Sequence, residues 1–278
     1  MDKNLLHDMI RDFLREDVGR GDITSESIFY EHEIGSARLV ARDSFIVAGV
    51  ESVVAEVFKV QNPAVITVDG VPDGTWARPK MSLLTVSGPV IDLLKAERVA
   101  LNLLQRLSGI ATLTAQFVEK VKVYSVRITD TRKTTPGLRV LEKYAVRVGG
   151  GANHRFNLAD GVLIKDNHIA ACGSIREAVD KLRQRIPHTI RIEVETDSLE
   201  QVEECLACGV DIIMLDNMSP EMMSKAVRII NGRALVEASG GVTLDTVESI
   251  AMSGVNIISI GALTHSAPSC DIGMDWSF

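Results

Sequence analysis

The sequence is poor in aromatic residues and in long apolar runs, and each shortage excludes a class of protein. Aromatic residues make up 4% of the 278 residues, against 46% hydrophobic residues, so the core is expected to be aliphatic. No apolar run approaches the roughly 20 residues that a membrane-spanning helix needs. The N-terminal segment is acidic and amphipathic, which fits neither a signal peptide nor a transit peptide. We therefore expect a cytoplasmic protein with no membrane partner.

Positive charge and cysteine are also scarce. The chain has 30 Lys and Arg residues against 37 Asp and Glu residues, and its net charge is −7. Binding of a nucleic acid needs clustered cations that neutralise phosphates, so we expect no nucleic acid partner. One CxxC pair is present, but no second pair and no paired histidines complete a zinc site. Reduced structural thiols are expected, with a metal or redox site as the alternative, for Cys172, Cys205, Cys208 and Cys270.

The basic residues that are present gather where short apolar runs end. Arg132 and Lys133 follow the first of these runs. His154 and Arg155 follow a glycine run, and Lys165 ends the next apolar run. Concentrating cations costs self-repulsion, and the planar Arg side chain matches the oxygens of carboxylates and phosphates. The sequence therefore predicts a site for a small anionic ligand.

The second half of the sequence repeats one pattern, which is a short aliphatic run, a polar residue at its end and a capped helix. We expect strands at 162–165, 189–195, 211–216, 234–239 and 257–260. Strands that alternate with helices indicate parallel pairing, and continuous apolar runs indicate burial on both faces. A barrel and a doubly wound sheet would both satisfy this pattern. We favour a barrel, because polar residues end nearly every run and no early GxGxxG follows the first strand.

Residues 1–107 are expected to form a smaller α/β domain. A helix over about 4–16 precedes β-rich segments around 34–50 and 64–90, which glycine and proline separate. A long amphipathic helix from Asp92 to about Lys122, interrupted near Ser108 and Gly109, is expected to join this domain to the barrel. The barrel domain is placed at 108–264, and the tail at 265–278 is expected to pack back on the first domain.

Five motifs, in their order and spacing, give nearly the whole chain a specific resemblance to a known family. They are DTRKTTPG at 130–137, GGGANHR at 149–155, LIKDNH at 163–168, LDN at 215–217 and SGG at 239–241. These motifs resemble those of the quinolinate phosphoribosyltransferase family. The resemblance implies an N-terminal α/β sandwich domain and an open (β/α) barrel of parallel strands. It also implies homodimers or assemblies of dimers.

The implied reaction joins quinolinate to phosphoribosyl pyrophosphate, with Mg²⁺ as cofactor. Its products are nicotinate mononucleotide, carbon dioxide and pyrophosphate, which places the enzyme in the de novo synthesis of NAD. The resemblance assigns the two carboxylates of quinolinate to a set of cations. These are Arg132, His154, Arg155, Lys165 and Arg98, the last from the neighbouring subunit.

The resemblance implies catalytic roles for Lys133, Glu195 and Asp216. Lys133 would hold the phosphates and the leaving pyrophosphate. Glu195 and Asp216 would lie near the ribose and Mg²⁺, where they would offset the positive charge that grows on the sugar. Glu193, on the strand of Glu195, is expected to point to the opposite side. The remaining predicted substrate-binding residues, mostly glycines and neighbours with backbone N–H groups before helix starts, are Thr131, Ser239, Gly240, Gly241, Ile260, Gly261 and Ala262.

Several alternatives stay open. Each cation alone could be a solvated surface residue, His154 a structural histidine and Asp216 a helix cap. A barrel aldolase or phosphosugar isomerase would use Lys165 as a Schiff-base amine. The related group associated with molybdenum transport departs from the motif at 164–168, which this sequence keeps. A non-catalytic sensor of phosphorylated anions would not need the acidic residues that accompany the cations.

Overall fold

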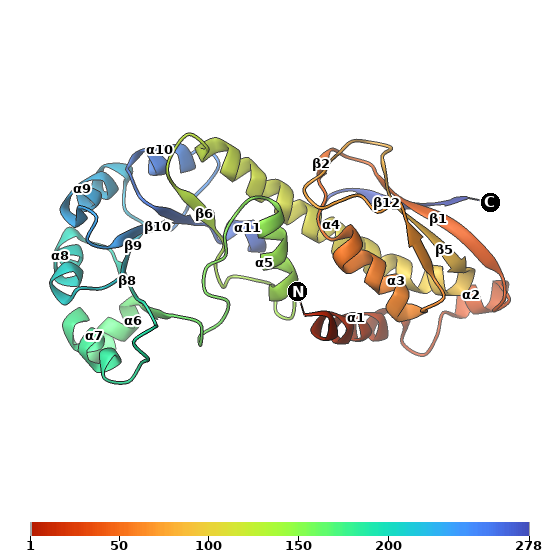
Figure 1. The fold of residues 1–278 in the computed structure, drawn as a ribbon, viewed down its shortest axis with the longest axis horizontal. Coiled ribbons are helices and arrows are strands. Elements are labelled where there is room, and N and C mark those ends of the chain that lie inside the picture. Colours follow the sequence, from red (N-terminus) through yellow and green to blue (C-terminus); the bar gives the residue numbers. More distant parts are fainter. Residues whose placement is uncertain (1, 278) are drawn as a thin grey trace. The chain divides into compact units, whose positions relative to one another are not determined.

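A computed structural model describes residues 2–277 and divides the chain into two units (Figure 1). The first unit runs to Leu113 and also contains Val140–Gly149 and the tail from Ala267. The second unit contains Thr114–Arg139 and Gly150–Ser266. The first unit therefore extends beyond the expected boundary at 107, and it includes a stretch of chain that the sequence had placed in the barrel.

An antiparallel sheet of four strands forms the centre of the first unit. The tail strand pairs with the first strand, although the two lie at opposite ends of the sequence. A separate two-stranded sheet pairs β2 (Phe45–Ile46) with β4 (Trp76–Ala77). In sheet order the four strands are β12 (Ile272–Ser277), β1 (Ile34–Ala41), β5 (Ser82–Pro89) and β3 (Ile66–Val68).

Helices accompany this sheet in the first unit. Helix α1 (Lys3–Val18) begins after Asp2, whose side chain accepts a hydrogen bond from the Leu5 backbone N–H, and it contacts α3. The helical segment at 50–61 was not predicted, although its buried valines recur at helical spacing. The other helical elements here are α2 (Ile23–Ile28), the π-helix η1 (Val50–Val54) and α3 (Ala55–Gln61). Among the residues described, no helix is long and apolar enough to cross a membrane.

Helix α4 (Val90–Val121) runs without a break through Ser108 and Gly109, so the expected interruption is wrong. A Cβ atom on Gly109 would lie 1.9 Å from the carbonyl oxygen of Pro268. The glycine is therefore required by the close approach of the tail, and the helix stays regular. The neighbouring Ser108 Oγ accepts a hydrogen bond from the Ala48 backbone N–H at 3.2 Å.

The second unit contains a parallel sheet of six strands. From one edge, five strands follow one another in sequence order, and the strand that comes first in the sequence lies at the other edge. A doubly wound sheet instead reverses its strand order partway across. Within residues 2–277 the two outer strands do not pair with each other, so the expected open barrel is confirmed. In sheet order the strands are β6 (Arg127–Thr129), β11 (Ile257–Ser259), β10 (Leu235–Ser239), β9 (Ile212–Asp216), β8 (Ile192–Thr196) and β7 (Val162–Ile164).

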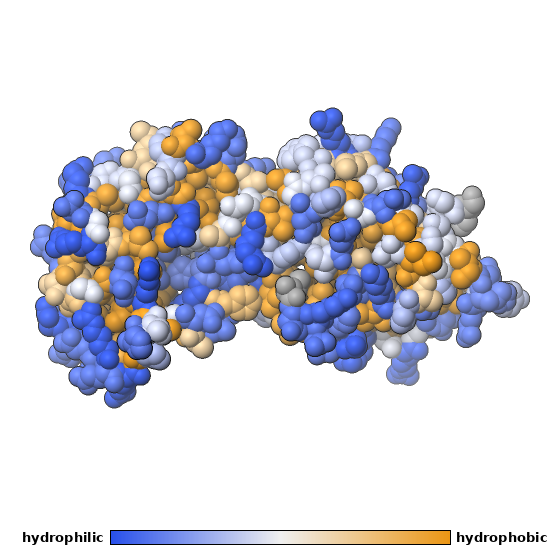
Figure 2. Space-filling view, viewed as in Figure 1, coloured by the Kyte–Doolittle hydropathy of each residue, from blue (hydrophilic) through white to orange (hydrophobic). Residues whose placement is uncertain are grey.

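Helices connect the strands, and three of these helices begin after a serine cap. Ser174, Ser198 and Ser219 each accept a hydrogen bond from a backbone N–H three residues later. The outer face of α7 is strongly hydrophilic, at the lower left of Figure 2. Helix α5 (Arg139–Val148) belongs to the first unit except for Arg139. The helices of the second unit are α6 (Asp166–Cys172), α7 (Ile175–Arg183), α8 (Leu199–Cys208), α9 (Pro220–Ile230), α10 (Val247–Met252) and α11 (Ala262–His265).

The CxxC pair lies in α8, where Cys205 and Cys208 are both buried. All four cysteines are free thiols, as expected.

Candidate active site

A cavity of about 520 Å³ opens among the carboxyl ends of the barrel strands. It brings together most of the residues that the sequence predicted for the site. Those that line it are Thr131, Arg132, Lys133, His154, Arg155, Lys165, Glu195, Asp216, Ser239, Gly240 and Gly241. The other residues that line it were not predicted for the site, and they are Leu163, Met214, Asn217, Glu237 and Ser259.

Four predicted residues do not line this cavity. Ile260 is buried, and its backbone N–H donates to the Thr129 carbonyl at 2.9 Å. Gly261 and Ala262 follow it at the start of α11. Arg98 is exposed on α4 in the first unit. Their roles in substrate binding stay predictions.

Two guanidinium groups form the cationic wall of the cavity. Arg155 donates a hydrogen bond to the Gly161 carbonyl at 2.9 Å. Burial, together with the nearby charge of Arg132, lowers the pKa of Arg155. Within the described residues, the Nε atom of Arg132 is buried and has no hydrogen-bond partner. An anion bound between these groups would relieve both their mutual repulsion and this unpaired donor.

The loop after β6 holds Lys133 at the edge of the cavity. Its backbone N–H donates to Thr131 Oγ1 at 3.0 Å, and its carbonyl accepts from Thr264 Oγ1 at 2.7 Å. A Cβ atom on Gly261 would lie 2.9 Å from Lys133 Cδ. Gly261 therefore contributes by leaving space for the Lys133 side chain rather than by lining the cavity.

The motif at 164–168 fixes Lys165 at the start of α6. His168 Nδ1 accepts a hydrogen bond from the Lys165 backbone N–H at 2.9 Å. The Lys165 ammonium lies 2.9 Å from Glu195 Oε2, and this ion pair forms part of the cavity wall. The pair puts an ammonium group and a carboxylate side by side on the cavity wall.

Asp216 ends β9 beside a tightly folded turn. Its Oδ2 atom accepts a hydrogen bond from Asn217 Nδ2 at 2.6 Å. Asn217 has a φ of +53°, and its backbone N–H donates to the Ser239 carbonyl at 2.9 Å. A Cβ atom on Gly240 would lie 2.2 Å from Asn217 Oδ1. The SGG motif is thus explained in part by the close approach of Asn217, which the sequence analysis had not assigned to the site.

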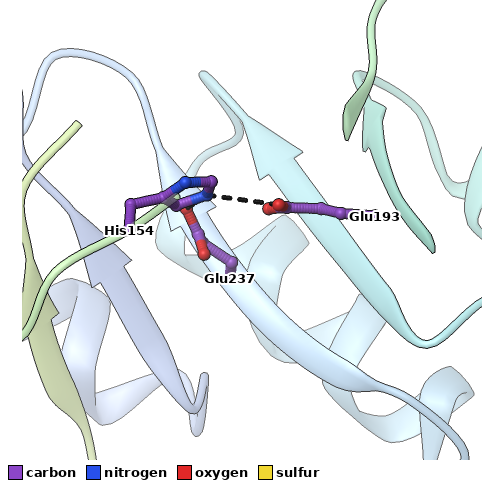
Figure 3. Close-up of side chains that lie close together, drawn as sticks. All are labelled: His154, Glu193 and Glu237. Carbon is purple, nitrogen blue, oxygen red and sulfur yellow. Dashed lines mark ion pairs between the residues drawn. The ribbon is translucent and has the colours of Figure 1, made fainter. Parts of the chain in front are cut away.

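Deeper in the barrel, His154 points at two buried carboxyl groups (Figure 3). Its Nε2 atom lies 3.2 Å from Glu193 Oε2 and 3.6 Å from Glu237 Oε1. Its Nδ1 atom accepts a hydrogen bond from the Arg155 backbone N–H at 2.8 Å, so the ring carries its proton on Nε2. The ring therefore directs its N–H group at the carboxyl pair.

The position of Glu193 corrects one expectation. Glu193 was expected to point to the opposite side from Glu195, but residues two apart on a strand share a face. Both side chains face the barrel interior, and Glu193 lines a second cavity of about 400 Å³. This second cavity lies toward the amino ends of the strands and shares His154, Arg155 and Glu237 with the first.

Glu237 is 2% exposed and was missed by the sequence analysis. Burial, and then the neighbouring Glu193 carboxylate, raise the pKa of Glu237 to about 7, whereas His154 opposes the shift. The barrel interior is therefore more polar than the apolar runs of its strands indicated. The only sequence signal was that Glu237 shares its face with Ser239, two residues further along β10.

Comparisons with known proteins agree with this geometry. The model of the quinolinate phosphoribosyl transferase N-terminal domain matches residues 22–108, and that of the C-terminal domain matches residues 110–275. The chain belongs to the quinolinate phosphoribosyl transferase family. The resemblance drawn from the five motifs is thus confirmed.

Relatives and solved structures match over nearly the full length. A probable nicotinate-nucleotide pyrophosphorylase [carboxylating] of Bacillus subtilis is 47% identical over 270 residues, covering 97% of this chain and 93% of the relative. The crystal structure of NadC from Streptococcus pyogenes has a TM-score of 0.94 at 41% identity, covering 100% of this chain and 99% of that one. The nicotinate-nucleotide pyrophosphorylase of Ehrlichia chaffeensis gives 0.93 at 43% identity, with coverage of 100% and 99%.

Proposed function

We propose that this protein transfers the phosphoribosyl group of phosphoribosyl pyrophosphate to quinolinate and releases carbon dioxide and pyrophosphate. Membership of the family supports this reaction, whose product is nicotinate mononucleotide. The observation that carries the proposal is the pair formed by Arg132 and Arg155 at the cavity wall. Two neighbouring guanidinium groups, one with an unpaired buried donor, suit the two adjacent carboxylates of quinolinate.

The second substrate would occupy the other side of the cavity. Lys133 would contact the leaving pyrophosphate, and the backbone N–H groups around Gly240 and Gly241 would bind the sugar phosphate. Glu195 and Asp216 would lie near the ribose, where their charge would stabilise an oxocarbenium-like transition state. No nucleophile is needed for this displacement, so rate enhancement comes from positioning and electrostatics.

The donor set fits Mg²⁺. Glu195 and Asp216 offer carboxylate oxygens at the cavity, and a hard cation that keeps most of its waters prefers such ligands. When bound, Mg²⁺ would neutralise charge on the pyrophosphate. Lys165, paired with Glu195, would keep that carboxylate in place.

We further propose that the protein acts as a homodimer in the cytoplasm, and that Arg98 of one subunit completes the site of the other. The exposure of Arg98 on α4 supports this role. Mixing Arg98→Ala with Lys165→Ala subunits tests it, because hybrid dimers would contain one site with both residues intact. Recovery of part of the activity is expected. No recovery, despite proven subunit exchange, would exclude shared sites.

A pyrophosphate-release assay that compares quinolinate with nicotinate tests the proposed reaction. Release with quinolinate and phosphoribosyl pyrophosphate, together with one carbon dioxide per pyrophosphate, is expected. A preference for nicotinate would overturn the substrate. In a parallel experiment, borohydride should trap no carbonyl substrate on Lys165, because no Schiff base is part of this reaction.

A further inference from the structure

We propose that Glu237 donates the proton that replaces the carboxylate lost from the pyridine ring. This inference rests on the proposed function and assigns one of its steps to a residue. Glu237 lies on the wall of the candidate active site and also lines the second cavity, toward the amino ends of the strands. Glu237 is thus shared by the substrate cavity and a second cavity from which a proton could be supplied.

Decarboxylation requires such a donor. When the bond between ring carbon C2 and its carboxylate breaks, carbon dioxide leaves and the electron pair stays on C2, beside the positively charged ring nitrogen. The O–H bond of Glu237 then breaks and a C2–H bond forms, which leaves Glu237 as a carboxylate. A proton from water in the second cavity restores the acid, so each turnover consumes one solvent proton.

The contacts of the carboxyl group suit this role. Glu237 is 2% exposed, and its Oε1 atom has no hydrogen-bond partner among the described residues. Glu193 Oε1 also has no hydrogen-bond partner among the described residues. Glu237 makes a side-chain hydrogen bond with Ser259, whereas the atom closest to Oε1 among its ion-pair partners is His154 Nε2, at 3.6 Å. Burial of the carboxyl group favours its protonated form, and Oε1 is left available to a reacting carbon.

The charges around Glu237 favour its protonated form near neutral pH. Burial and the Glu193 carboxylate raise its pKa to about 7. His154 and a side-chain hydrogen bond with Ser259 act in the opposite direction. The single ring proton of His154 lies on the nitrogen that also faces Glu193. The other charged groups lining either cavity are Arg127 on β6, Arg132 and Lys133 in the loop after it, Arg155 and Asp160 in the segment after His154, Lys165 after β7, Arg191 before β8, Glu195 on β8, and Asp216 on β9.

A metal ion is the rival occupant of this cluster. Ligand atoms of His154, Glu193 and Glu237 lie within 4.8 Å of one another, as a metal site would need. A metal on His154 Nε2 would move the ring proton to Nδ1, where it would face the N–H group of Arg155. This donor-to-donor contact favours the hydrogen-bonded arrangement over metal binding.

The test compares the wild-type enzyme with Glu237→Gln and Glu193→Gln. The wild type must first convert quinolinate and phosphoribosyl pyrophosphate to nicotinate mononucleotide. Its kcat is expected to fall as pH rises through about 7, where Glu237 loses its proton. Glu237→Gln should lower kcat about a hundredfold, which is within the range of a lost general acid, and should remove this fall with pH.

Two further readouts separate proton donation from a structural role. In a mixture of H₂O and D₂O, the ratio of hydrogen to deuterium at C2 of the product should differ between Glu237→Gln and the wild type, because the donor differs. Glu193→Gln keeps the donor but removes a negative charge beside it. The fall of kcat should therefore move to lower pH in this variant.

The outcomes are distinct. A wild type without nicotinate mononucleotide formation would sink the proposed function itself. If the wild type is active and Glu237→Gln has the same kcat, pH profile and isotope ratio, the inference alone is overturned. It is also overturned if the wild type binds one equivalent of metal and Glu237→Gln binds none. If Glu237→Gln does not fold, the pH shift of Glu193→Gln decides the question.

Discussion

The buried carboxylate of Asp130 accepts a hydrogen bond from the backbone N–H of His154 at 2.9 Å. Its other oxygen accepts from Asn153 Nδ2 at 2.5 Å. Asp130 immediately precedes the loop that carries Arg132, and His154 belongs to a segment far along the chain. This one side chain therefore joins the two basic segments of the site within the second unit.

Replacing Asp130 with alanine should destabilise the protein. The change removes two hydrogen bonds to a charged acceptor, one from the Asn153 side-chain amide and one from the His154 backbone N–H, and such bonds contribute roughly 1.5–3 kcal/mol each. Urea unfolding measures the loss. Asp160→Ala is the matched control, because Asp160 also accepts from two backbone N–H groups but is exposed. Equal losses in the two variants would contradict the role given to Asp130.

Replacing Arg132 with alanine should weaken quinolinate binding with the fold intact. A charged hydrogen bond contributes roughly 1.5–3 kcal/mol, so the KM for quinolinate should rise about tenfold to a hundredfold. Steady-state kinetics with each substrate varied in turn measures the effect. Arg228→Ala, which removes an exposed arginine of α9, should leave both KM values unchanged. Near-normal quinolinate kinetics of Arg132→Ala would remove this residue from the site.

Replacing Gly261 with alanine should disturb the second substrate rather than quinolinate. The new methyl group would lie 2.9 Å from Lys133 Cδ and would displace that side chain. The backbone φ of Gly261 is −66°, so alanine adds no backbone strain at this position. We expect a higher KM for phosphoribosyl pyrophosphate at an unchanged thermal unfolding midpoint. A change confined to the quinolinate KM would show that Lys133 serves the other substrate.

Stability should fall as pH rises toward neutrality because of Glu237. Its pKa is about 7 in the folded protein, above the ordinary value near 4.5, so the folded state binds more protons between these pH values. The contribution is complete below pH 4.5 and is lost as pH rises through about 7. Glu237→Gln should therefore gain stability relative to the wild type from pH 5 to pH 8 in urea unfolding. A constant difference across this range would argue against the raised pKa.

The buried thiols should react only after unfolding. Burial raises the pKa of Cys205 to about 12 and that of Cys270 to about 11. The reactive thiolate is thus scarce at pH 8 in the native protein. A chromogenic disulfide reagent should label Cys205 and Cys208 far more slowly before denaturation than after it. Fast native labelling of either residue, located by mass spectrometry, would contradict this burial.

The sequence was most informative where local signals decide structure. Helices α7, α8 and α9 each begin after a serine whose side chain accepts a backbone hydrogen bond, and such caps act over three residues. Arg132, Lys133 and Lys165 were found because they follow apolar runs. Parallel strands place such positions at one edge of the sheet, and the cavity confirms that they lie together.

The sequence was least informative where distant segments meet. Gly109 was expected to interrupt α4, but its reason is the Pro268 carbonyl, which no local pattern reveals. Glu237 was missed because an acidic residue inside an apolar strand gives no sign of its partners. Its neighbours come from β8 and from the segment of His154, and only the folded barrel brings them to one place.

The chain passes between its two units four times, at 113/114, 139/140, 149/150 and 266/267. The first of these passages lies inside α4, and the next two flank most of α5. Neither unit is a continuous stretch of sequence, so recombination cannot transplant one of them into another protein by a single exchange. A protease that cut one passage would leave the others covalently intact, and the nicked pieces would have to unravel before they could separate.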